Sequence, residues 1–178
     1  MPSPLPLMTL PAPLVTARLV LSAITAADFE DLARLAADPE VGGKLKHGVL
    51  TPDQSRALLQ DYCDGWNRLG YGVFMVRRRD DHRFVGLAGL WEHDDGHGAA
   101  LRYAVMPEHR GQGFTKEAVV AVLDFAAARG LGTIRAVTRE TNAVSRKILT
   151  GLGFHLVELR QKADRRVAIY SQHSPEPS

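Results

Sequence analysis

Hydrophobic and polar positions change their period several times along the first third of the chain. Apolar and polar residues alternate over residues 18–24, which predicts a strand. From Thr25 onward the apolar residues recur at helical spacing, so we expect Thr25 to cap a helix over residues 26–38 that Pro39 stops. Residues 41–50 follow neither period and are predicted to form a loop.

A second helix and three strands follow. The pair Thr51-Pro52 is typical of a helix start, because a hydroxyl side chain caps the first turn and proline fits its first position. Helical spacing continues to Leu69, and Gly70 can adopt the left-handed conformation that ends a helix. Polar clusters then separate three predicted strands on short turns, an antiparallel meander over residues 71–79, 83–93 and 99–106.

The second half of the chain alternates helix and strand. The strongest helical pattern is Thr115–Arg129, and we expect its apolar stripe in the core, formed by Ala118, Val119, Val122, Leu123 and Ala126. A strand over 132–140, a helix over 143–152 and a hairpin over 154–160 and 166–172 are predicted after it. A strand–helix–strand unit within an otherwise antiparallel sheet indicates a mixed α/β fold.

Length and composition limit the domain number and the classes of partner. The 178 residues fit one domain, which we place at residues 14–172 between a proline-rich leader (1–13) and a short tail (173–178). A net charge of +2 gives no sign of nucleic-acid binding, and no apolar run is long enough to span a membrane. The single cysteine, Cys63, excludes an intrachain disulfide and suits the cytoplasm. We interpret it as a packed residue rather than a nucleophile.

The segment with the clearest chemistry joins the third strand of the meander to the strongest helix. A short loop leads directly into this helix: Arg110 followed by Gly111-Gln112-Gly113. Glycines let a backbone approach an anion closely, and the first N–H groups of a helix have no partner within it. The spacing fits neither the Rossmann nor the P-loop pattern. We therefore predict an anion cradle suited to a pyrophosphate, with Arg110 and Lys116 adding positive charge.

Three ordered segments resemble the GNAT superfamily of acetyltransferases. The run Arg110–Ala118 resembles its acetyl-CoA pyrophosphate loop, although Thr115 replaces the usual small residue. Asn142-Ala-Val-Ser145, followed by Gly153-Phe154, is similar to its second signature. Together with the opening run Arg18–Leu21, these segments look like the branch of ribosomal-protein N-terminal acetyltransferases.

The resemblance implies a GNAT-like fold: a mostly antiparallel, splayed sheet of about six to seven strands with about four helices. It implies acetyl-CoA as co-substrate and no metal. The acceptor is expected to be an amine, either of a small molecule or at a peptide N-terminus. The resemblance is compatible with a homodimer. The backbone near Val105 is expected to polarise the acetyl carbonyl. The residues implied to bind the cofactor are Val105, Arg110, Gly111, Gln112, Gly113, Phe114, Thr115, Lys116, Asn142 and Ser145.

Acetyl transfer to an amine needs a base for the amine and stabilisation of the leaving thiolate. At the end of the second meander strand, Glu92 is our first candidate for the base and His93 the second. Ser145 is the candidate partner of the thiolate, as the resemblance implies. The tyrosine acid that is frequent in the superfamily would fall near Leu149, and we interpret Tyr103 as a core aromatic and only a remote substitute.

One departure from the branch bears on catalysis. The branch often carries Glu-x-Gly-Tyr on the strand before the loop, whereas this chain has Ala100-Leu101-Arg102-Tyr103. The missing carboxylate motivates a second hypothesis, a non-catalytic acyl-CoA-binding or sensor module. A third is a nucleotide or phosphometabolite binder that uses the same helix start. The sequence does not identify the acceptor.

Overall fold

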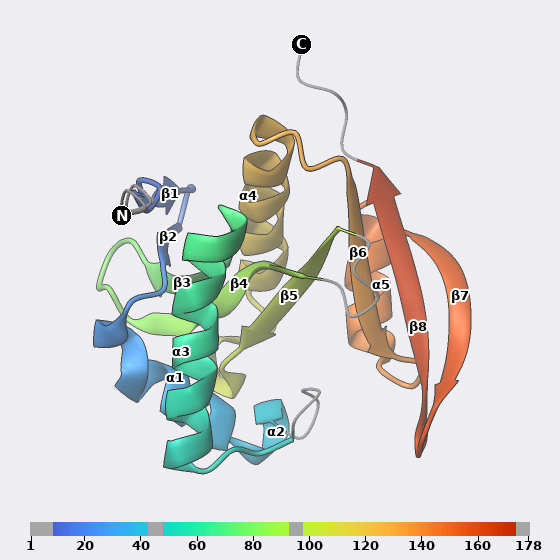
Figure 1. Cartoon of the computed structure of the whole chain (residues 1–178), viewed down its shortest axis with the longest axis horizontal. Coiled ribbons are helices and arrows are strands. Elements are labelled where there is room, and N and C mark those ends of the chain that lie inside the picture. Colours follow the sequence, from blue (N-terminus) through green and yellow to red (C-terminus); the bar gives the residue numbers. More distant parts are fainter. Residues whose placement is uncertain (1–8, 43–47, 93–97, 174–178) are drawn as a thin grey trace, which may run out of the picture.

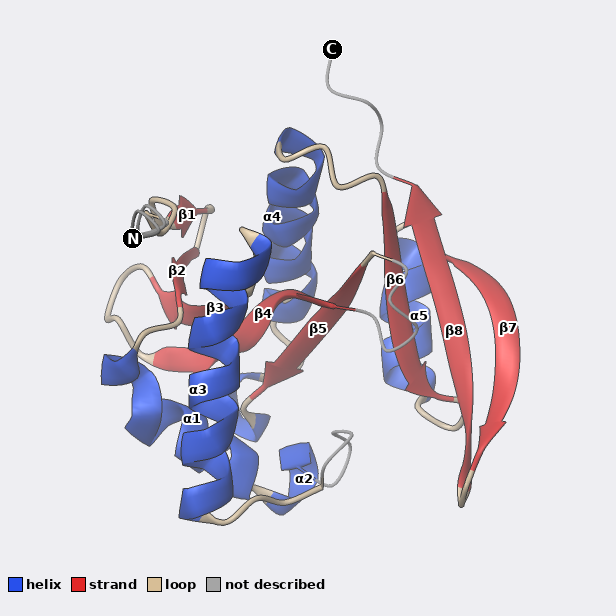
Figure 2. Ribbon diagram, in the orientation of Figure 1, coloured by secondary structure: helices blue, strands red, loops and turns tan. Residues whose placement is uncertain are grey.

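The computed structural model describes residues 9–42, 48–92 and 98–173. Within these ranges the chain forms one eight-stranded sheet and five α-helices (Figures 1 and 2). The strands are β1 (Leu14–Val15), β2 (Leu19–Ala23), β3 (Val73–Arg78), β4 (Phe84–Glu92), β5 (Ala99–Val105), β6 (Thr133–Arg139), β7 (His155–Lys162) and β8 (Arg165–His173). The helices are α1 (Phe29–Ala37), α2 (Pro39–Gly42), α3 (Pro52–Leu69), α4 (Phe114–Ala128) and α5 (Ala143–Gly151).

The strand order is β1-β2-β3-β4-β5-β6-β8-β7, and the β5–β6 pair is the parallel one. The predicted mixed, mostly antiparallel fold is confirmed. Figure 1 shows α3 in front of the sheet and α4 and α5 behind it. Strands β3 and β4 are buried along nearly their whole length, since they are covered on both faces.

The predicted helices differ from the structure near the N-terminus. Thr25 and Asp28 form a capping box, yet residues Ala26–Asp28 form a 3-10 turn and the α-helix begins only at Phe29. Pro39 does end the preceding helix, but it also begins the short helix α2. The prediction of a loop from residue 41 was therefore wrong for Val41 and Gly42, because proline is favourable in the first turn of a helix.

The other helices follow the predicted signals closely. Thr51 and Gln54 form a capping box at the start of α3, and Gly70 ends it with a φ of 75°. In α4 the predicted stripe is buried except for Leu123, which is only partly buried, while Phe125 is an additional core residue. Phe125 contacts Phe74 and Trp66 edge to face, with centroids 5.3 and 6.0 Å away.

The sheet opens at its centre between β5 and β6. These strands pair only over Ala99–Leu101 and the facing residues from Ile134 to Ala136. Beyond that point β5 stays paired with β4 as far as Val105, and β6 stays paired with β8 as far as Arg139. The two halves of the sheet therefore diverge while each keeps its own ladder, and the predicted splay is present.

Candidate active site

A cavity of about 660 Å³ lies where β5 and β6 diverge. Strand β5 from Ala100 to Val105 and the end of β6 line it, together with α5 and the turn between β7 and β8. Its volume is in the range of small-molecule and cofactor sites. The predicted site residues that line it are Glu92, Val105, Arg110, Thr115, Asn142 and Ser145.

The backbone of Val105 turns its polar groups toward the gap. Val105 faces Gly86 on β4, and the Met106 N–H donates to the Val85 carbonyl at 2.8 Å. This pattern makes Val105 and Gly86 a non-hydrogen-bonded pair, so the N–H of Val105 points away from β4. On its other side β6 has already diverged. A backbone donor beside Val105 thus faces the space where β5 and β6 separate.

The glycine loop, residues 110–113, ends at the start of α4 next to the cavity. Gly111 and Gly113 have φ values of 76° and 78°, a conformation that side-chain-bearing residues rarely adopt. A Cβ added to Gly111 would meet nothing within 4 Å, so the approach to the loop is open. The free N–H groups of the first turn of α4 and the helix dipole suit this place to an anion, and the residues fit a pyrophosphate.

Not every residue of the predicted cradle can contribute its side chain. Phe114 is only 5% exposed, so it can contribute its N–H but not its ring. Lys116 is exposed and lines a shallower pocket of about 420 Å³ on another side of α4. Arg110 reaches α2, where it donates to the Glu40 carbonyl at 3.2 Å.

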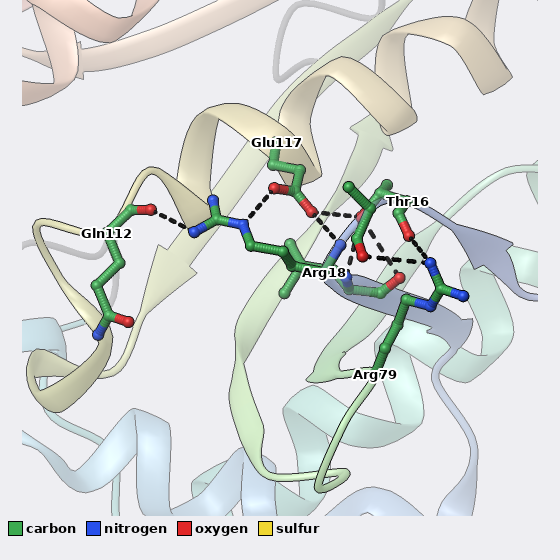
Figure 3. Close-up of polar contacts among 7 residues, drawn as sticks. Thr16, Arg18, Arg79, Gln112 and Glu117 are labelled. Atoms are coloured by element: carbon green, nitrogen blue, oxygen red, sulfur yellow. Dashed lines mark hydrogen bonds and ion pairs between the residues drawn. The ribbon is translucent and has the colours of Figure 1, made fainter.

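Arg18, the residue before β2, holds the glycine loop in place through hydrogen bonds. Arg18 donates to the Glu117 carboxylate through Nε at 2.8 Å and to the Gln112 carbonyl at 2.8 Å (Figure 3). Thr16 donates a further hydrogen bond to Glu117 at 2.5 Å. The Arg18 guanidinium also lies over the Phe114 ring, 4.5 Å from its centroid. The arginine offsets the charge of the carboxylate, which by itself would repel an anion at the helix start.

The contacts with Thr16 and Arg18 also change the pKa of Glu117. Burial raises the pKa of this carboxyl, but the hydrogen bonds from Thr16 and Arg18 and the charge of Arg18 outweigh burial. The net pKa therefore lies below its usual value, and Glu117 stays ionised at neutral pH.

Two hydroxyls meet at the wall of the cavity. The Tyr103 hydroxyl lies 2.6 Å from Ser145 Oγ, so β5 and α5 are joined across the gap. Burial raises the pKa of Tyr103, and the hydrogen bond with Ser145 offsets only part of this rise. The tyrosine is thus protonated at neutral pH and able to donate. Tyr103 packs partly buried against the core, as we interpreted it, and it also lines the cavity.

Asn142 holds Ser145 in place. Its side-chain oxygen accepts from the Ser145 N–H at 3.1 Å, which is the predicted N-cap of α5. Asn142 also lines the cavity, so capping does not remove it from the site.

Glu92, the last residue of β4, lines the cavity and pairs with Arg68 of α3 at 2.8 Å. The ion pair engages one of the two carboxylate oxygens of Glu92, Oε2. His93, the second candidate base, lies outside the described residues. Ala100 faces the cavity with a methyl group alone, as its position in the sequence predicted.

The other sequence features give no competing site among the described residues. Burial raises the pKa of the Cys63 thiol, which disfavours the nucleophilic thiolate. In the same ranges, no group of three or more His, Cys, Asp or Glu side chains is placed to hold a metal ion. None of the described helices is long and apolar enough to cross a membrane.

Known proteins resemble the chain in sequence and in fold. An uncharacterized N-acetyltransferase of Bacillus subtilis, YoaA, is 27% identical over 144 residues, which are 79% of this chain and 81% of that protein. A GNAT-family acetyltransferase from Bordetella pertussis has the same fold, with a TM-score of 0.82, 22% identity and coverage of 91% of this chain and 99% of that one.

A third relative bears on the cofactor. RimL, a ribosomal L7/L12 α-N-protein acetyltransferase in complex with coenzyme A, matches with a TM-score of 0.79 and 18% identity over 91% of this chain and 98% of its own. At this identity the likeness shows a shared fold, and it is in line with the branch that the motifs resemble. Residues 18–155 match the model of the acetyltransferase (GNAT) domain, so the chain belongs to the GNAT family and is an acetyl-CoA-dependent acetyltransferase.

Proposed function

We propose that this chain transfers the acetyl group to a primary amine, the N-terminus of a peptide or a small molecule, by direct attack in a ternary complex. The observation that carries the proposal is the Tyr103–Ser145 hydroxyl pair beside the diverging strands, 2.6 Å apart and in the wall of the cavity. Direct attack is favoured because Cys63, the one thiol of the chain, does not line this cavity.

Each chemical requirement has a candidate group in the cavity wall. The N–H of Val105 faces the gap and is suited to stabilise the oxyanion that forms when the amine attacks the thioester carbonyl. As the C–N bond forms and the C–S bond breaks, Ser145 donates a hydrogen bond to the leaving sulfur. The thiolate then takes the proton of Ser145, Tyr103 passes its proton to Ser145, and Tyr103 regains a proton from solvent.

The amine must lose a proton. Of the carboxylates that line the cavity in the described ranges, we propose Glu92 as the acceptor of this proton, either directly or through a water. Its ion pair with Arg68 engages Oε2, so the proton passes to the other oxygen, Oε1. An α-amino group at a peptide N-terminus, with a pKa near 7.7–8.0, is partly neutral at pH 8 and needs little help.

The proposal is tested by following coenzyme A release from acetyl-CoA with a panel of amines, in the wild type, Ser145→Ala and a matched control. Thr150→Ala is the control, because Thr150 lies on the same helix and bonds only the Arg146 carbonyl of that helix. We expect turnover with at least one amine, a loss of about 10- to 100-fold in kcat for Ser145→Ala, and no change for Thr150→Ala. Binding of acetyl-CoA without turnover of any amine would instead favour the non-catalytic acyl-CoA-binding module.

A further inference from the structure

The cavity holds a cation that its own carboxylates do not neutralise. Arg102 lines it from β5, at the position where the related branch often has glycine. Three described carboxylates line the same cavity, and each already has an arginine partner: Glu40 with Arg110, Glu92 with Arg68 and Asp164 with Arg165. Within the described parts of the chain, none of these or other carboxylates pairs with Arg102.

Aromatic rings hold Arg102 in a fixed place. Its guanidinium donates to the Tyr62 hydroxyl at 2.9 Å and lies 5.7 Å from the Tyr62 ring centroid and 5.8 Å from that of Trp91. Trp91 in turn packs against α3 at Gly65, where an added Cβ would lie 2.7 Å from the indole. A guanidinium has five N–H donors, and the single hydrogen bond to Tyr62 leaves donors for a ligand.

Arg102 is adjacent in sequence to Tyr103 and lies on the other face of β5. Side chains alternate along a strand, so Tyr103 meets Ser145 of α5 while Arg102 meets Tyr62 of α3. Both side chains nevertheless line the same cavity, so an anion bound by Arg102 on the α3 side shares that cavity with the hydroxyl pair on the α5 side. Ala100, on the same face as Arg102, has only a methyl group and leaves room for that anion.

A second arginine, Arg139 at the end of β6, adds positive charge to the wall of the same cavity.

We propose that Arg102 selects acceptors that carry a carboxylate in addition to the amine. Two sources share this chemistry: the α-carboxylate of a free amino acid, and the acidic side chain at the second position of a peptide. The arginine binds the carboxylate, orients the amine toward the acetyl carbonyl and so fixes the acceptor class. This inference rests on the proposed function, because it names the acceptor of the same reaction.

The test uses acceptor pairs that differ only in the carboxylate. One arm compares free amino acids with their α-amides, and the other compares tripeptide amides Ser-Asp-Ala and Ser-Asn-Ala. Binding in the presence of coenzyme A is measured by tryptophan fluorescence, and kcat/KM is measured with acetyl-CoA. The chain has two tryptophans, and Trp66 is 3% exposed in the core, so Trp91 in the cavity wall reports the binding.

We expect the carboxylate member of at least one pair to bind and react at least 10-fold better than its neutral partner. In Arg102→Gln this ratio should fall to about 1, while the affinity for coenzyme A stays within twofold of the wild type. Arg102→Lys should keep part of the preference, and Arg83→Gln, on the exposed β3–β4 turn, should keep all of it. The arm that shows the preference identifies the source of the carboxylate.

Three results would overturn the inference: equal use of acid and amide by the wild type, a preference that survives in Arg102→Gln, or no binding of any acceptor. A carboxylate preference in binding without turnover would uphold the inference and overturn the proposed function, so the two failures are distinguishable. If Arg102→Gln does not fold, Tyr62→Phe removes the hydroxyl that orients the guanidinium, and the preference should then fall severalfold.

Discussion

The hydroxyls of Tyr103 and Ser145 lie 2.6 Å apart although 42 residues separate them in the chain. Ser145 could be named from its motif, because it follows an N-cap asparagine at fixed spacing. Tyr103 could not, since a tyrosine in an alternating strand is usually a core residue. Its access to the cavity depends on where β6 leaves β5, and that pairing has no local signal in the sequence.

The two hydroxyls should act as a unit. We expect Tyr103→Phe to lower kcat by about 10-fold, because Ser145 then loses the group that supplies its proton. Steady-state kinetics of both single variants and the double variant form a cycle, and the double variant should be no slower than Ser145→Ala alone. Losses in kcat that multiply in the double variant would show that the residues act independently.

Glu117 should make folding sensitive to acid. Its folded-state pKa lies below the unfolded value of about 4.3, so it stabilises the fold above that pH and loses this effect as the pH falls through the folded pKa. We expect Glu117→Gln to lower the free energy of unfolding by about 1 kcal/mol at pH 7, with the difference shrinking below pH 4. Urea unfolding at pH 3 to 7 measures both; a difference that is constant over this range would contradict the assignment.

At the scale of elements, local signals located most helices well. Thr51, Gly70 and Asn142 cap helices where they were predicted to, because their chemistry acts within one turn. The errors at Pro39 and Phe29 arose because a proline can both end one helix and begin the next, and a 3-10 turn has nearly the same sequence signals as an α-turn.

The contact of Arg18 with the glycine loop is of a different kind, since it joins segments 94 residues apart. The sequence motif marked Arg18 as characteristic but did not show what it contacts. In the structure, the arginine connects the start of β2 to the start of α4 through Gln112 and Glu117.

We therefore expect Arg18→Gln to weaken acetyl-CoA binding by about 5- to 10-fold, because the loop loses a charge-assisted hydrogen bond that fixes its backbone. The value of kcat at saturating acetyl-CoA should stay within twofold of the wild type, since Arg18 does not line the cavity. Calorimetry and saturation kinetics measure the two effects, with Arg83→Gln as the control. A fall in kcat with unchanged affinity would refute this role.

At the scale of the whole molecule, the site exists because two half-sheets diverge. Residue patterns predicted the order of strands and helices, and family resemblance supplied the splay, but the register did not follow from either. Only three residue pairs join β5 to β6, and this shortness frees the N–H of Val105 and creates the cavity. Such long-range pairings depend on the packing of the whole chain.

The central claim, that the start of α4 and the diverging strands bind acetyl-CoA, is tested most directly by calorimetric titration of the wild type and Gly113→Glu with acetyl-CoA. Gly130→Glu is the matched control, because Gly130 has a φ of 65°, so it imposes similar backbone strain at the opposite end of α4. We predict micromolar binding by the wild type and by Gly130→Glu, and no measurable binding by Gly113→Glu, because its side chain starts beside the Arg18 guanidinium that holds the loop and adds a negative charge at the anion cradle. Equal affinity of the two glutamate variants, or no binding by the wild type, would contradict the claim.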